Sequence, residues 1–177
     1  MSVAANRYAS ALMQALPSEK SESAYEQLRT FASILESQNQ AKRLFENPTV
    51  SAERRKSLAS AIGNAVGFDT PVLNFVNILI ERNRLDLLEE ILLAFEKLLD
   101  DRLGIVRASV TSAGPMDQEQ QDRLKAKLGA MTGKKVLMQV SVDPELLGGV
   151  VARVGSTIYD GSLRQQLKSF RTKLTHE

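Results

Sequence analysis

The chain has 177 residues, of which 43% are hydrophobic and 25% charged, and its formal net charge is +2. This length suits one generous domain or two small ones, and the composition is ordinary for a globular protein. Charged residues interrupt every long apolar run, so we expect no membrane-spanning segment, and the absence of cysteine excludes disulfides and thiolate chemistry.

The N-terminal part of the chain has apolar residues at helical spacing, which predicts six helices. The second is predicted to begin at Ser23, which has capping-box spacing to Glu26, and the fifth at Pro71 with Thr70 as its N-cap. Gly67 is expected to end the fourth helix. The predicted ranges are residues 3–16, 23–35, 40–45, 52–66, 71–82 and 85–102.

The fifth predicted helix is apolar around most of its circumference. This pattern indicates that it is central to a bundle, that one of its sides awaits a partner, or both. Its apolar residues are Val72, Leu73, Phe75, Val76, Ile78, Leu79 and Ile80.

Beyond Gly104 the apolar period changes from 3.6 to 2, which predicts a domain boundary. The pattern then predicts a strand over 106–111. A helix follows, from a capping box at Asp117 to a C-cap at Gly133, and after it a strand over 136–142. We therefore expect a helical domain over 1–104 and a small α/β domain over 105–177.

The last 35 residues combine turn chemistry with two short strands. Asp143-Pro144 is expected to stop the preceding strand, and Gly148-Gly149 supplies backbone freedom before strands over 149–154 and 156–159. Asp160-Gly161 predicts a turn, and Ser162 with Gln165 predicts the start of a final helix. Its apolar stripe, expected to pack on the strands, comprises Leu163, Leu167, Phe170 and Leu174.

Residues that carry reaction chemistry are nearly absent. The only histidine, His176, is next to the last residue, where chain ends fray. Gly129 to Lys135 looks like a phosphate loop but is one residue short, lacks the Mg²⁺-binding hydroxyl and precedes a strand. We expect no catalytic residue, no metal and no cofactor.

Charge is unevenly divided along the chain. Residues 1–104 hold 12 Lys/Arg against 14 Asp/Glu, whereas residues 105–177 hold 11 against 7. The opposite signs suggest two domains with different partners, although the excess of four is too small for a nucleic-acid arm.

The C-terminal segment resembles the signature of the delta subunit of F-type ATP synthases, the family of the oligomycin sensitivity-conferring protein. The resemblance lies in Gly148-Gly149, the apolar-Arg153-apolar-Gly155 run and Asp160-Gly161-Ser162-Leu163-Arg164. Residues 4–9 (AANRYA) and the Asn83-Arg84-Leu85 helix junction agree with it.

This resemblance implies an α+β protein, with an N-terminal six-helix bundle followed by a small C-terminal α/β domain. It implies a non-catalytic peripheral-stalk subunit that resists rotor torque. Residues 1–104 would bind N-terminal helices of the alpha subunits of the catalytic head, and residues 105–177 the b-type stalk subunits. By resemblance, the head-binding groove lies between helices one and five and would offer Tyr8, Ala9, Leu12, Val72, Phe75, Val76 and Leu79.

Two other classes of function stay open from the residues alone. A free-standing RNA-binding accessory protein would use the basic C-terminal domain, and a hydrolase would use carboxylates. The chain opens without a presequence pattern, which favours the cytoplasmic face of a bacterial inner membrane, peripheral to the membrane through the complex.

Overall fold

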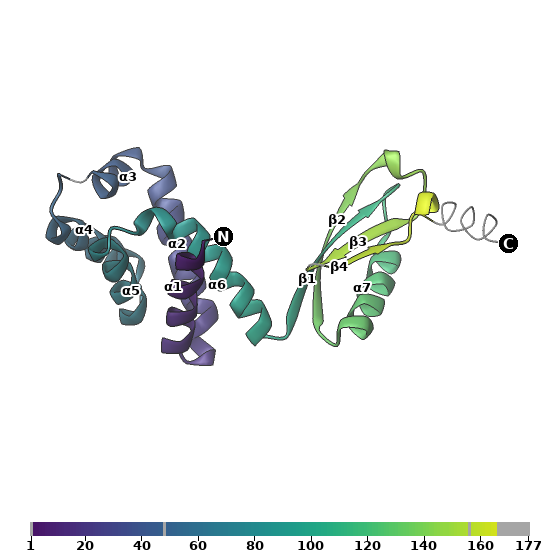
Figure 1. The fold of residues 1–177 in the computed structure, drawn as a ribbon, viewed down its shortest axis with the longest axis horizontal. Helices are drawn as coiled ribbons and strands as arrows, with labels where there is room; N and C mark the ends of the chain where they lie inside the picture. The colour runs from purple at the N-terminus through teal and green to yellow at the C-terminus, as the bar shows by residue number, and fades with distance from the viewer. Residues whose placement is uncertain (1, 48, 156, 166–177) are drawn as a thin grey trace. The chain divides into compact units, whose positions relative to one another are not determined.

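The computed structural model describes residues 2–47, 49–155 and 157–165. The chain divides into two compact units, Met1–Arg102 and Leu103–Glu177, hereafter the helical unit and the sheet unit (Figure 1). The structure is mostly helical with one small sheet in the described residues, so the α+β class is confirmed.

The helical unit contains successive helices joined by short turns. A 3₁₀ turn, Ser18–Lys20, precedes the second helix, and another, Leu85–Leu87, precedes the last. The α-helices are α1 (Val3–Ala15), α2 (Ser21–Ser37), α3 (Asn39–Glu46), α4 (Ala52–Val66), α5 (Thr70–Glu81) and α6 (Leu88–Arg102).

Several helix starts differ from the sequence prediction, and α6 begins at Leu88 rather than at residue 85, after the 3₁₀ turn. Helix α2 begins at Ser21, so Ser23 lies inside the helix and the predicted capping box is wrong. The buried Ser21 hydroxyl instead donates to the Pro17 carbonyl (3.1 Å). Helix α5 has Asp69 as its N-cap, and a side chain of α2, Gln27, accepts the Asp69 N–H (2.8 Å). Gly67, which follows the last residue of α4, adopts φ +79°, as expected for a glycine that ends a helix.

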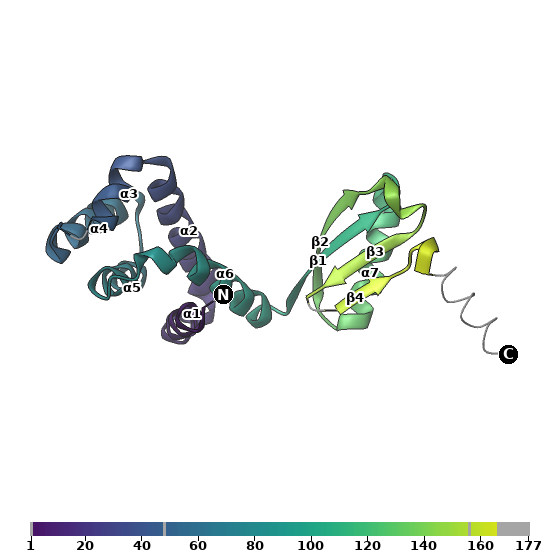
Figure 2. The same cartoon turned by 45° about the horizontal axis from the view of Figure 1, so that its top comes forward.

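The core of the helical unit lies where α6 packs against α1 and α2, and α4 pairs with α5 (Figure 2). Aromatic rings fill its centre: Phe31 meets Phe45 and Phe68 edge-on, and Tyr25 stacks on Phe95 with centroids 6.4 Å apart. Aromatic pairs of this geometry add about 1 kcal/mol beyond the area they bury. The largest fully buried side chains here are Phe31, Phe95, Leu28, Leu79, Ile80 and Ile91.

Arg102, the last residue of α6, ties three helices together. Its Nη2 donates to the Met13 carbonyl (2.9 Å) and its Nη1 to the Leu16 carbonyl (3.4 Å) and the Ser21 hydroxyl (2.8 Å). The last carbonyls of a helix have no partner within it, and a cation stabilises that end. Arg102 therefore caps α1 and fixes the start of α2.

The sheet unit has the strand order β2-β1-β3-β4. Strand β1 (Ile105–Ser112) runs parallel to β2 (Lys135–Val142) and antiparallel to β3 (Val150–Val154), which pairs antiparallel with β4 (Thr157–Asp160). Helix α7 (Gln118–Thr132) connects β1 to β2 and packs through Leu128 on one sheet face. The expected capping box is present, with Asp117 Oδ1 accepting the Gln120 N–H (2.7 Å).

The Gly148-Gly149 turn brings the start of β3 against the turn after β4. Gly149 has φ +84°, and a Cβ there would lie 2.3 Å from the Gly161 carbonyl oxygen. The Gly148 carbonyl accepts the Leu163 N–H (3.0 Å), and Ser162 Oγ accepts the Gln165 N–H (3.3 Å). The predicted capping contact is thus present, but the stripe positions Leu167, Phe170 and Leu174 lie outside the described residues.

Alanine at Gly149 should destabilise the sheet unit by about 3 kcal/mol, because the left-handed backbone and the clash with Gly161 add together. Gly155 is the matched control: it has φ +60°, but a Cβ there meets nothing within 4 Å, so Gly155→Ala should cost only about 1 kcal/mol. Hydrogen exchange of the β3 amides measures both. Equal costs for the two substitutions would show that the close approach at Gly149 is unimportant.

Candidate functional site

The described residues contain no arrangement that suggests reaction chemistry. Among them, no group of three or more His, Cys, Asp or Glu side chains is placed to hold a metal ion. No described helix has the length and apolar character needed to cross a membrane. His176 lies outside the described residues.

The predicted partner-binding residues converge from two helices on one core. Six of the seven are buried, and Tyr8 is half-buried. Tyr8 meets Phe75 edge-on, with ring centroids 6.4 Å apart and planes at 74°. The structure thus brings α1 and α5 together through these rings. The buried six are Ala9, Leu12, Val72, Phe75, Val76 and Leu79.

Small and apolar residues lie on the solvent-facing side next to this ring contact, with Arg7 and Asn74 at its edge. Positions three, four and seven residues apart share one side of a helix, so Ala4, Ala11 and Ala15 accompany Tyr8. On α5, Pro71 and Ile78 accompany Phe75, and Ile78 is 46% exposed. We call Ala4, Tyr8, Ala11, Ala15, Pro71 and Ile78 the α1/α5 face.

The prediction from sequence omitted Ala11, Ala15 and Ile78 from the site. Their signal was present in the spacing, because all three repeat at three, four or seven positions from Tyr8 or Phe75. Periodicity shows which residues share a side, but it does not show which side the core occupies.

The opposite side of α5 is closed by α4. A Cβ at Gly63 would lie 2.2 Å from Cδ2 of Leu73, so the two helices approach closely there. Lys56 on α4 and Glu81 on α5 form an ion pair between the same two helices. The hydrogen bond from Lys56 lowers the pKa of Glu81, and the same bond raises the pKa of Lys56. This side of α5 is therefore occupied by α4.

Helix α1 is fixed in position by hydrogen bonds at both of its ends. At its start, Ser2 Oγ accepts the Ala5 N–H (3.2 Å), and the Ser2 N–H donates to the Glu90 carboxylate on α6. Hydrogen bonding from Ser2 lowers the pKa of Glu90. At the far end, Arg102 holds the last carbonyls. The α1/α5 face is therefore held in place by polar contacts at both ends of α1.

A depression of about 550 Å³ lies between α2, α3, α4 and the start of α6. Its apolar floor includes Leu35, Phe45 and Leu88. Arg55 crosses it, with Nη1 donating to the Phe45 carbonyl (3.3 Å) and to Asn83 Oδ1 (3.0 Å). Both cationic and carboxylate side chains line the rim, so the depression does not favour a ligand of either charge.

Comparison with known proteins identifies relatives along nearly the full length. The model of the family described as "ATP synthase delta (OSCP) subunit" matches residues 4–174. Similar proteins named "ATP synthase subunit delta" occur in Solidesulfovibrio magneticus (34% identical, covering 97% of this chain and 96% of the relative) and Myxococcus xanthus (36%; 96% and 95%). Another, from an Anaeromyxobacter species, is 39% identical (96% and 96%).

A solved structure also shares the fold. It is a chain of the Toxoplasma gondii mitochondrial ATP synthase hexamer, with a TM-score of 0.66 and 23% identity, covering 99% of this chain and 98% of that one. At this identity the likeness concerns the fold alone.

The Ser2–Glu90 contact predicts an acid-sensitive start of α1. Because the folded-state pKa of Glu90 is lowered, the stability that it contributes is present above the ordinary glutamate pKa and is lost as the pH falls through the lowered value. The protection factors of the Ala5 and Asn6 amides, which are corrected for the intrinsic pH dependence of exchange, should therefore fall below about pH 4 in the wild type. In Glu90→Gln this fall should be absent, and the same profile in both proteins would contradict the assignment.

Proposed function

The chain belongs to the ATP synthase delta (OSCP) subunit family, and from this premise we infer that it is a non-catalytic subunit of the peripheral stalk of an F-type ATP synthase. The observation that carries this inference is the family match over residues 4–174, with relatives 34–39% identical. The subunit supports ATP synthesis and hydrogen-ion transport as a structural link, peripheral to the membrane-bound complex. The resemblance found in the sequence is confirmed.

We propose that each of the two domains of the chain binds a different part of the synthase. Residues 1–104 act as a six-helix bundle that binds N-terminal helices of the alpha subunits of the catalytic head. Residues 105–177 bind the b-type stalk subunits. Support comes from the surfaces: the α1/α5 face is apolar and free of charge, whereas residues 105–177 have a net charge of +4. Surfaces this different suit partners of different chemistry.

The α1/α5 face is proposed as the head-binding site. An amphipathic helix binds by laying its apolar stripe against a complementary surface. Small residues such as Ala11 and Ala15 would allow the backbone of that helix to approach closely. Tyr8 and Ile78 would contact the partner directly. The predicted residues Ala9, Leu12, Val72, Phe75, Val76 and Leu79 are buried, and they would act by fixing the spacing between α1 and α5.

The stalk role requires slow dissociation under torque. A nanomolar complex corresponds to about 12 kcal/mol, which one interface of roughly 800 Å² a side supplies when it has buried apolar anchors. We place the subunit at the cytoplasmic face of a bacterial inner membrane, since the relatives compared above are bacterial. No observation favours the RNA-binding alternative, because the chain has 5% aromatic residues and no tryptophan for base stacking.

Affinity purification tests the function as a whole. A tagged full-length chain expressed in its own host should retain the alpha and beta subunits of the head together with the b-type subunits. Recovery of RNA without any synthase subunit would contradict the stalk role.

Ile78→Asp should weaken binding to the isolated head at least 10-fold, or about 1.4 kcal/mol, because it buries a charge in an apolar interface. Leu93→Asp on α6 is the matched control, since Leu93 is 55% exposed and lies outside the α1/α5 face. Both variants should unfold at the wild-type denaturant midpoint, and ATP hydrolysis by the isolated head should be unchanged. Equal affinity of both variants for the head would show that the head does not bind at the α1/α5 face.

A further inference from the structure

Helix α5 forms one side of the α1/α5 face, but it is not one of the helices that pack closely on α1. The closest helix pairings of the helical unit are α1 with α6, α2 with α6, and α4 with α5 (Figure 2). Tyr8 and Phe75 join α1 to α5 through a ring contact with centroids 6.4 Å apart. The distance across the face therefore depends on what holds the two ends of α5.

The start of α5 is held by a side chain of α2. An aspartate at an N-cap usually accepts an N–H from the first turn of its own helix, but Asp69 makes no such bond. Gln27 binds Asp69 instead: its Oε1 accepts the Asp69 N–H (2.8 Å), and its Nε2 donates to Asp69 Oδ2 (3.3 Å). Local capping is thus replaced by a two-point contact with another helix.

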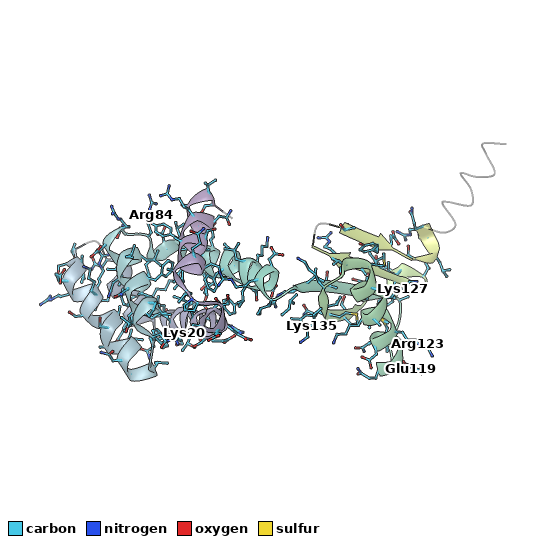
Figure 3. The ribbon with its side chains drawn as sticks, turned by 90° about the horizontal axis from the view of Figure 1, so that it is seen from below. Lys20, Arg84, Glu119, Arg123, Lys127 and Lys135 are labelled. Carbon is cyan, nitrogen blue, oxygen red and sulfur yellow. The ribbon has the colours of Figure 1, made fainter. Side chains whose placement is uncertain are left out.

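The end of α5 is held through a residue with a left-handed backbone. Asn83 follows the C-cap Arg82 and has φ +51°, a conformation that glycine adopts more readily. Arg84, labelled in Figure 3, closes the turn by donating its N–H to the Leu79 carbonyl (2.8 Å). Asparagine supplies what glycine lacks, because Asn83 Oδ1 accepts a hydrogen bond from Arg55 Nη1 (3.0 Å).

Arg55 reaches this turn from α4 and binds a second helix end as well. Its Nη1 also donates to the Phe45 carbonyl (3.3 Å), one of the last carbonyls of α3. Its Nε is buried without a hydrogen-bond partner among the described residues, which costs stability. The left-handed asparagine costs stability too. The arrangement therefore favours a fixed position of α5 over local stability.

We propose that Gln27 and Arg55 are positioning residues of the head-binding site, which hold the two ends of α5 at the distance from α1 that a head helix requires. Neither residue belongs to the α1/α5 face, so each acts through another residue, Gln27 through Asp69 and Arg55 through Asn83. This proposal rests on the head-binding function proposed above and adds to it the side chains that set the geometry of the site.

The test removes each contact and keeps it in a matched variant. Gln27→Leu removes the contact with Asp69, whereas Asp69→Asn keeps an oxygen that Gln27 Nε2 can bind. Asn83→Gly removes the acceptor for Arg55 and relieves the left-handed backbone, whereas Asn83→Asp keeps the acceptor. Thr30→Ala is the control on α2, because the exposed Thr30 hydroxyl donates only within its own helix, to the Glu26 carbonyl (2.8 Å).

Affinity is measured with full-length chains and the isolated catalytic head of the same organism as the probe. Gln27→Leu and Asn83→Gly should each lose about tenfold in affinity. Asp69→Asn, Asn83→Asp and Thr30→Ala should stay within about threefold of the wild type. Asn83→Gly should lose affinity while its denaturant midpoint stays near the wild-type value, because glycine relieves the backbone, and this split separates positioning from stability.

A distance measurement tests the geometry without the head. The chain has no cysteine, so Gln14→Cys on α1 and Asn74→Cys on α5, both exposed positions, allow two spin labels to be attached. Pulsed electron paramagnetic resonance on the labelled free chain should give a broader or shifted distance distribution in Gln27→Leu and Asn83→Gly. The distribution should be unchanged in Asn83→Asp and Thr30→Ala.

Four results would overturn the proposal. Wild-type affinity in Gln27→Leu and Asn83→Gly, or an equal loss in Thr30→Ala, would show that these contacts do not set the site. A loss of affinity with unchanged label distances would show that the side chains act on the head directly. A loss confined to variants with a lowered denaturant midpoint would make both residues structural alone. A wild-type chain that does not bind the head would contradict the proposed function itself, whatever the label distances show.

Discussion

The helical unit depends on the way α6 holds two other helices in place. Its buried side chains pack against both α1 and α2, and Phe95 stacks with Tyr25 of α2. Arg102 then satisfies the Met13 and Leu16 carbonyls at the end of α1 and the buried Ser21 hydroxyl at the start of α2. A hydrogen bond from a charged group contributes about 1.5–3 kcal/mol, so this one guanidinium helps to fix the relation of three helices.

The two units use opposite physical means to present a surface. The α1/α5 face has no charged residue, so we expect its interactions to depend on buried apolar area and to change little with salt. The sheet unit instead exposes Lys135, Arg107 and Arg153 on the adjacent strands β2, β1 and β3, so we expect the interactions of this surface to respond to ionic strength.

Local signals in the sequence located most elements, and contacts between distant residues explain the differences. The boundaries of α4 and the Asp117 capping box match the prediction because each depends on neighbours within four residues. The start of α5 was placed on Thr70, but Gln27 lies 42 positions away and fixes Asp69 as the cap. For the candidate site, spacing grouped Tyr8 with Leu12 and Phe75 with Leu79. Which members are buried depends on α4 and α6, whose docking no local pattern encodes.

The junction between the units is short and is fastened at both of its ends. Arg102 is anchored on α1 and α2, the Gly104 carbonyl accepts the Lys135 N–H (2.9 Å), and β1 begins at Ile105. Only Leu103 lies between Arg102 and Gly104, and the two steps of extended chain that join them span at most about 7 Å. The two units therefore cannot separate by more than this short reach unless one of the anchored ends unravels.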